Sequence, residues 1–180
     1  ACRINRLRKT RFQTFTETSD PAKHPPRLAA LRKAMAAEGL DAFLIPRADA
    51  HQGEYVADAD ARLRWLTGFS GSAGQAIVTA DRAGVFVDGR YRVQVKAEVD
   101  LAHFTPVPFP EVKPGDWLAE ALPDGGRVGF DPWLHTHREI ADLRKRLDPE
   151  GIALVPVENL VDRIWTNQPD APVGQVRLHD

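Results

Sequence analysis

The chain has 180 residues, of which 43% are hydrophobic and 27% are charged, and its formal net charge is -1. This composition is ordinary for a folded soluble domain. The single cysteine, Cys2, excludes an intramolecular disulfide framework and a thiolate zinc site. No apolar run approaches the roughly 18 residues of a transmembrane helix, and no signal-peptide core is visible. We therefore expect a cytoplasmic protein that does not bind membranes.

The charge is unevenly distributed along the chain. Residues 1–11 hold five basic side chains and no acid, so the remaining residues carry a charge of -6. An acidic body argues against a nucleic-acid partner. The basic segment could be a nucleic-acid arm or a transit peptide, but a disordered tail or an added extension is the simpler interpretation. With the polar stretch that ends at Pro26, it predicts a basic and polar N-terminal tail over residues 1–26.

Apolar residues at helical spacing predict the helices. Leu28, Leu31 and Met35 form one apolar face of a helix that stops at Gly39, and a second, short helix ends at Gly68. Similar patterns predict helices marked by residues 91–99, 117–122 and 160–165.

Two helix starts carry capping signals. Asp116 can cap the helix of residues 117–122. Thr136, with Glu139 three residues later, predicts a capping box at the start of a helix that Gly151 ends.

Short apolar runs predict buried strands at residues 42–45, 75–79, 85–88, 104–107, 127–130 and 152–155. Five residues, 80–84, join the second and third strands and predict an antiparallel hairpin. Strands otherwise alternate with helices, which predicts an α/β fold with a mixed sheet and helices on both faces. We expect the domain to span residues 27–157 and residues 158–180 to be a linker or the start of a second domain.

The glycine-rich segment of residues 68–74 is the most unusual part of the chain. It differs from a nucleophile elbow because neither Ser70 nor Ser72 has glycine at both i-2 and i+2. Its glycines also lack the spacing of a dinucleotide-binding loop. The favoured interpretation is a tight structural loop, with nucleotide binding as the alternative.

Three further segments contain residue types that can carry chemistry. His135 and His137 have no third ligand nearby, so we predict no metal site and expect both on the exposed start of a helix. His51 lies in a polar loop that follows a buried strand, where α/β proteins often bind ligands. Asp88 can pair with Arg90 and fix a turn, or Arg90 can grip a substrate carboxylate.

Four tryptophans occur in or next to apolar clusters, at Trp65, Trp117, Trp133 and Trp165. Core packing explains all four without a ligand.

Several segments together resemble the N-terminal domain of the creatinase, prolidase and aminopeptidase P family. Residues 65–74, the hairpin after them, and residues 88–91 with Gln94 resemble the stretch typical of this family. Residues 45–55 and 157–165 are similar to the long, three-domain Xaa-Pro aminopeptidases. The resemblance covers residues 27–168 and leaves residues 1–11 unmatched.

The resemblance implies a six-stranded mixed sheet with helices on both sides, related to ribonuclease H. It implies a parent enzyme that removes the residue preceding a proline in second position. In the family, a C-terminal catalytic domain holds two metal ions, typically manganese, through carboxylates and a histidine. That ligand pattern is not matched here, so we expect no cofactor and no catalytic residue in this chain.

The family's N-terminal domain walls the active-site cleft and shapes the quaternary arrangement. The expected partners are therefore the chain's own catalytic domain, proline-containing peptides and a second copy in a homodimer. We predict that His51, Arg90 and Tyr91 face the substrate. The alternatives are a stand-alone small-molecule or nucleotide-binding module that uses residues 68–74, and an interaction protein that retains the domain without its enzyme.

Overall fold

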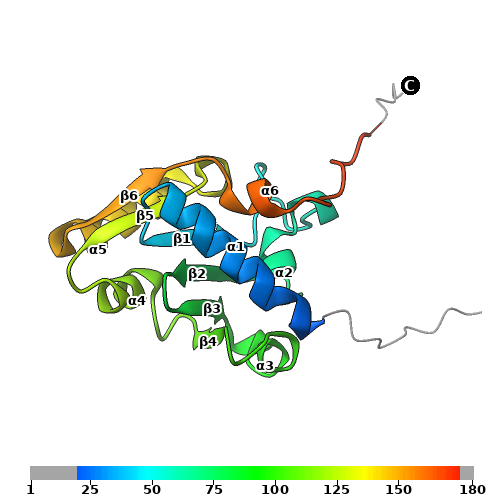
Figure 1. Ribbon diagram of the computed structural model, residues 1–180, viewed down its shortest axis with the longest axis horizontal. Helices are drawn as coiled ribbons and strands as arrows, with labels where there is room; N and C mark the ends of the chain where they lie inside the picture. The colour runs from blue at the N-terminus through cyan, green and yellow to red at the C-terminus, as the bar shows by residue number, and fades with distance from the viewer. Residues whose placement is uncertain (1–19, 175–180) are drawn as a thin grey trace, which may run out of the picture.

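A six-stranded sheet forms the centre of the computed structural model, which describes residues 20–174 (Figure 1). The strands are β1 (Ala42–Pro46), β2 (Gln75–Thr79), β3 (Ala83–Val87), β4 (Thr105–Pro108), β5 (Gly126–Phe130) and β6 (Ile152–Pro156). Their order is β4-β3-β2-β1-β5-β6, and β2 is antiparallel to both neighbours while the other pairs are parallel. The predicted mixed sheet and its antiparallel hairpin are confirmed.

Helices cover both faces of the sheet, as expected. One face carries α1 (His24–Ala37), α2 (Arg62–Thr67), α3 (Gln94–Glu98) and α6 (Leu160–Ile164), and the other carries α4 (Pro114–Ala121) and α5 (His137–Leu147). In Figure 1, α1 crosses the sheet with α2 and α6 beside it. None of the helices in residues 20–174 has the length and hydropathy needed to cross a membrane.

Strand β1 illustrates how the sequence places both cores. Phe43 and Ile45 pack into the cluster on the α1 side, whereas Ala42 and Leu44 pack into the cluster on the α5 side. Successive side chains of a strand point to opposite faces, so a central strand that is covered on both sides is apolar throughout.

Strand β6 was predicted to be buried in the same way, and this is wrong. It lies at an edge of the sheet, where Ile152 and Leu154 are buried and Ala153 is exposed.

Helix α1 begins before residue 27, where the domain was expected to start. A short 3-10 turn, η1 (Pro21–Lys23), leads directly into α1, which begins at His24. Pro25 and Pro26 occupy the first turn of α1, where a proline costs no helical hydrogen bond. His24 is buried, so residues 21–26 are part of the folded domain. The expected basic segment, residues 1–11, lies outside the described residues.

Helix α6 lies after residue 157, where the domain was expected to end, and packs on the domain. Leu160 and Val161 of α6 are fully buried, and Trp165 stacks on Trp65 with ring centroids 5.2 Å apart. Helix α6 therefore contributes to the core on the α1 side.

One of the two predicted caps is confirmed. The Thr136 hydroxyl accepts a hydrogen bond from the Glu139 amide at 3.2 Å, and the Glu139 carboxylate accepts one from the Thr136 amide at 2.8 Å. Helix α4, in contrast, begins at Pro114 and not after Asp116. Asp116 lies in its first turn, where its carboxylate accepts a hydrogen bond from Arg146 Nε at 2.7 Å.

Two connections differ in detail from the prediction. Only residues 80–82 join β2 to β3, because β3 already begins at Ala83. The single helix expected over residues 91–99 is a 3-10 turn, η3 (Gly89–Tyr91), followed by α3.

Strand β4 forms the other edge of the sheet and pairs only with β3. The Phe109 amide donates to the Val87 carbonyl at 2.9 Å, so the odd-numbered residues of this segment face β3. In a parallel strand, the backbone N–H and C=O groups of alternate residues point to opposite neighbours. The backbone nitrogens of Pro106 and Pro108 therefore point away from β3, toward the open side of β4.

Candidate functional site

The segments predicted to carry function gather at one end of the strands of the sheet. Strands β1, β3, β4, β5 and β6 run in the same direction, so their carboxyl ends lie at this end of the sheet. Ligand sites of open α/β sheets lie outside the carboxyl ends of the strands. His51 lies in the loop that leaves β1, and Arg90 and Tyr91 lie in η3, which leaves β3.

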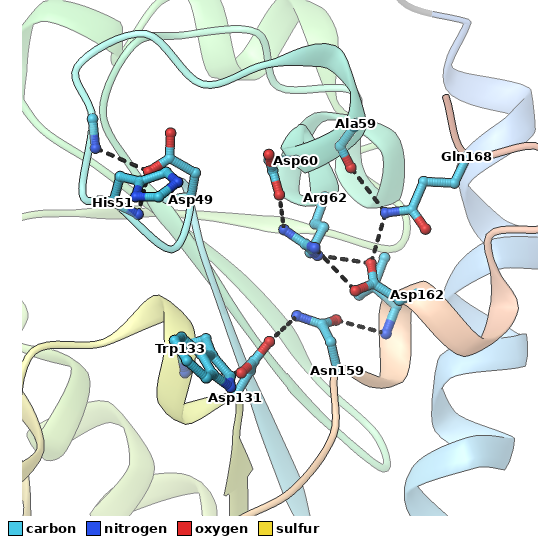
Figure 2. Close-up of polar contacts among 12 residues, drawn as sticks. Asp49, His51, Ala59, Asp60, Arg62, Asp131, Trp133, Asn159, Asp162 and Gln168 are labelled. Atoms are coloured by element: carbon cyan, nitrogen blue, oxygen red, sulfur yellow. Dashed lines mark hydrogen bonds and ion pairs between the residues drawn. The ribbon is translucent and has the colours of Figure 1, made fainter. Parts of the chain in front are cut away.

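The His51 loop is ordered by the neighbouring carboxylate. Asp49 Oδ1 accepts hydrogen bonds from the amides of His51 at 2.9 Å and Gly53 at 3.0 Å (Figure 2). These bonds lower the pKa of Asp49, and the one from Gly53 has the largest effect on it. The His51 side chain itself is exposed. The loop therefore holds His51 at the surface, and its role toward a substrate stays a prediction.

Arg90 makes the expected pair with Asp88. Its Nε and Nη2 donate to the two carboxylate oxygens at 3.0 and 2.8 Å, and its amide donates to Oδ1 at 2.9 Å. The guanidinium hydrogen bond lowers the pKa of the Asp88 carboxyl. About two-thirds of the Arg90 side chain (66%) is exposed. The pair fixes the turn while leaving the guanidinium accessible from solvent.

Tyr91 acts as an anchor between two segments. Its ring packs edge-on against Phe69 at 5.6 Å, and its hydroxyl shares a 2.5 Å hydrogen bond with the Ser72 hydroxyl. This bond lowers the pKa of Tyr91. Tyr91 thus joins η3 to the glycine-rich loop, and its contact with substrate stays a prediction.

The glycine-rich loop of residues 68–74 has the close packing expected of a structural loop. A Cβ atom on Gly71 would lie 2.2 Å from Cζ of Phe69, so only glycine fits there without displacing the ring. The amide and hydroxyl of Ser70 both donate to the Glu98 carboxylate, at 2.8 and 2.6 Å. A carboxylate therefore occupies the donors that a phosphate would need.

A groove of about 790 Å³ opens at the carboxyl ends of the strands, on the α4 and α5 side of the sheet. Its apolar lining includes Leu44 of β1, Phe86 of β3 and Ile140 of α5. Arg47 and Lys113 contribute cationic side chains to the lining. Such a volume is typical of small-molecule sites. None of the three predicted substrate-facing residues lines this groove.

His135 was expected to be exposed, and this is wrong. It is half-buried in the groove lining, with its ring edge-on to Phe130 at 5.8 Å. Its Nε2 atom is buried and has no hydrogen-bond partner among residues 20–174. Burial lowers the pKa of His135. His137 is exposed in the first turn of α5, as expected.

Core packing explains three of the four tryptophans. Trp65 and Trp165 stack on each other, and Trp117 packs edge-on against Phe86 at 5.9 Å. Trp133 is the exception, because 75% of it is exposed. It lies in η4 (Pro132–Leu134), directly before the groove residues Leu134 and His135.

Sequence reasoning missed two polar networks shown in Figure 2. Arg62 is 9% exposed; its Nε and Nη2 donate to Asp162 at 2.7 and 2.9 Å, and its Nη1 donates to Asp60 at 2.9 Å. In the second network, Asp131 accepts hydrogen bonds from the Trp133 amide at 2.9 Å and from Asn159 Nδ2 at 3.0 Å. Local patterns carry no signal for these pairs, because Arg62 and Asp162 are 100 residues apart.

The potential metal ligands of the domain are scattered. Within residues 20–174, no three His, Cys, Asp or Glu side chains gather closely enough to hold a metal ion.

The profile of the Creatinase/Prolidase N-terminal domain family matches residues 27–164. The chain belongs to this family. The match begins within α1 and ends at the last residue of α6, so it includes all six strands.

Relatives of the chain are much longer proteins. The chain is 38% identical over 150 residues to aminopeptidase P2 of Arabidopsis thaliana, a match covering 79% of this chain and 21% of the relative. It is 39% identical to Xaa-Pro aminopeptidase 2 of Homo sapiens, a match covering 81% of this chain and 22% of the relative. The chain therefore spans about a fifth of the length of these relatives.

Solved structures agree with this relation. One is an X-prolyl aminopeptidase from Caenorhabditis elegans, which is described as a cytosolic enzyme with a di-nuclear active site. It matches with a TM-score of 0.76 and 35% identity, and the match covers 82% of this chain and 26% of that chain. The N-terminal domain of the cytoplasmic peptidase PepQ from Mycobacterium tuberculosis matches with a TM-score of 0.58 and 28% identity, over 77% of this chain and 98% of that chain. The predicted fold class and family are confirmed.

Proposed function

We propose that this chain is the non-catalytic N-terminal domain of a metal-dependent Xaa-Pro aminopeptidase, an enzyme that removes the residue preceding a proline. In that enzyme the domain walls the active-site cleft and contributes to subunit contacts. The observation that carries the proposal is the match to an N-terminal domain family together with relatives several times longer than this chain, including an X-prolyl aminopeptidase from C. elegans of which the match covers 26%. The work of such a domain is positioning and not bond cleavage.

The two metal ions of the parent enzyme, which we propose to be manganese, belong to its C-terminal catalytic domain. Residues 20–174 do not fit such a centre, because their potential ligands form no group of three. We therefore assign no step of hydrolysis to these residues.

The proposed partners are the catalytic domain, proline-containing peptides at the shared cleft and a second copy of the parent enzyme. The proposed location is the cytoplasm, supported by the description of the C. elegans relative as cytosolic.

Hydrolysis by the purified chain tests the proposal directly. A peptide with proline in second position should stay intact in the presence of Mn²⁺, whereas a longer protein encoded by the continuing reading frame should cleave it. Cleavage by the 180-residue chain would refute a non-catalytic role. A reading frame without a metal-binding domain after Asp180 would instead favour a separate interaction protein.

We propose that His51, Arg90 and Tyr91 face the substrate in the parent enzyme. Arg90→Ala should raise KM or lower kcat/KM, because the accessible guanidinium is lost. The hydrogen bond from the backbone amide of residue 90 to the Asp88 carboxylate remains. Arg92→Ala is the matched control, since Arg92 is also exposed and paired, with Glu111. Equal KM and kcat/KM values for the two variants would contradict a contact between Arg90 and the substrate.

The alternative is a stand-alone module that binds a small molecule or nucleotide at residues 68–74. Its loop donors are already bonded to Glu98, whose negative charge repels phosphate. Calorimetric titration with common nucleotides should therefore give no heat of binding. Saturable heat that Ser70→Ala abolishes would favour the alternative.

A further inference from the structure

The side chain of Gln168 ties the chain after α6 to η2 (Asp58–Asp60), the turn that precedes α2. Its Nε2 donates to the main-chain oxygen of Ala59 at 2.8 Å and to Asp162 Oδ1 at 2.9 Å (Figure 2). A carboxamide nitrogen carries two hydrogens, so both of its donors are used. Both partners are acceptors, and only a donor can satisfy them at this place.

The two acceptors of Gln168 are themselves held in place by the body of the domain. Both oxygens of the Asp162 carboxylate accept hydrogen bonds from Arg62, and the same guanidinium binds Asp60 of η2. Arg62 is 9% exposed and Ala59 is 8% exposed, so neither can move without disturbing buried neighbours. Gln168 is therefore bonded to two fixed points that come from different segments of the chain.

The chain leaves the domain directly after these bonds. Residues 169–174 are all exposed and make no hydrogen bond or ion pair within residues 20–174. In Figure 1 this segment extends away from the domain beyond α6. Pro169 has a fixed φ and also restricts the backbone of Gln168 to extended conformations. The side-chain bonds thus fix the point of departure, and the proline limits the direction.

We propose that Gln168 is a positioning residue, which fixes the direction in which the chain continues and thereby the placement of the next domain of the parent enzyme. Thr166 and Asn167 are exposed, so without Gln168 the last anchored side chain would be Trp165. The inference rests on the proposed function, because it requires a parent as long as the relatives. The family profile ends at residue 164, before these contacts.

Amide hydrogen exchange of the 180-residue chain tests the anchor itself. The amides of Thr166 and Gln168 donate to the carbonyls of Ile164 and Trp165, at 3.1 and 3.2 Å. Gln168→Ala should lower their protection factors about tenfold, because the loss of two hydrogen bonds lets this segment open. Protection in β1 should stay the same, since the domain remains folded. Asn167→Ala, at an exposed amide side chain without a hydrogen bond in residues 20–174, is the control.

A second pair of variants tests the donor role of Gln168. Gln168→Lys keeps a donor for Asp162 and for the Ala59 carbonyl, so its protection factors should stay close to those of the wild type. Gln168→Glu keeps the length of the side chain but can only accept, and its charge has the same sign as that of Asp162. It should therefore lose as much protection as Gln168→Ala. Wild-type protection in the Glu variant would contradict the anchor.

Small-angle X-ray scattering and kinetics of the parent enzyme test the placement of the next domain. Gln168→Ala should enlarge the radius of gyration and lower kcat/KM several-fold, while the dependence on Mn²⁺ stays the same. Asn167→Ala and Gln168→Lys should behave as the wild type. Wild-type scattering and kinetics of the Gln168→Ala parent would overturn the positioning role. A wild-type parent that cleaves no Xaa-Pro peptide would refute the proposed function, whereas exchange and scattering would still decide the role of Gln168.

Discussion

The two faces of the sheet are covered by helices to different extents. On the α1 side, four helices enclose a continuous core in which Phe43, Leu66 and Phe69 have at most 1% of their surface exposed. On the other side, α4 and α5 cover a smaller cluster, and a groove stays open beside them. The α1 face therefore contributes more to stability, while the α5 face leaves surface available for binding.

The same substitution on each face should show this contrast most strongly. Leu66→Ala removes a fully buried side chain and should lower the free energy of unfolding by about 3–4 kcal/mol. Leu143→Ala, at a half-buried residue of the groove lining, should cost less than about 2 kcal/mol, since no enclosed cavity forms. Urea unfolding measures both. Equal losses would mean that the two faces are equally packed.

The next largest effect is expected at the ion network that joins α2 to α6. Arg62→Met leaves Asp60 and Asp162 without their cation and should cost about 2–3 kcal/mol, a value lowered because both carboxylates are about one-third exposed. The matched substitution Arg90→Met breaks an exposed pair and should cost less than about 1 kcal/mol. A loss at Arg62 no greater than that at Arg90 would contradict the structural role of this network.

The capping box on the α5 face should have a smaller effect. Thr136→Ala leaves the Glu139 amide without its acceptor and should cost about 1 kcal/mol. Thr166→Ala, at an exposed residue after α6, serves as the control and should change stability little. Chemical unfolding of the two variants side by side makes the comparison.

Each face also holds one histidine whose pKa is lowered by burial, His24 on the α1 side and His135 beside the groove. The folded state disfavours the protonated imidazole, so the unfolded state binds more protons as the pH falls below about 6.5. Stability should therefore decrease from neutral pH toward pH 5, above the range in which carboxylates titrate. His24→Gln and His135→Gln should each make this decrease shallower. A wild-type unfolding free energy that stays constant over this range would contradict the prediction.

Features determined by neighbouring residues could be predicted from the sequence. The apolar run of β1, the Thr136 capping box and the Asp88–Arg90 pair each involve residues at most a few positions apart. Helical or strand geometry alone brings such residues together. The family resemblance added the sheet type and the expected activity of the parent enzyme.

Features determined by the packing of distant segments could not be predicted. The contact of Arg62 with Asp162 spans 100 residues, and the groove combines residues from five strands and helices with the loops between them. Trp133 adjoins apolar residues in the sequence, but its 3-10 turn directs the indole to solvent while Leu134 packs inward. Neighbours in the sequence do not determine which of two adjacent apolar residues is buried.

The outward-facing prolines of β4 limit how this domain can associate with itself. An exposed strand can recruit another strand only by offering amide donors along its edge, and Pro106 and Pro108 have none to offer. Extension of the sheet by a second molecule is therefore blocked on the β4 side. Any assembly through continuous sheet hydrogen bonding would have to use the opposite edge, at β6.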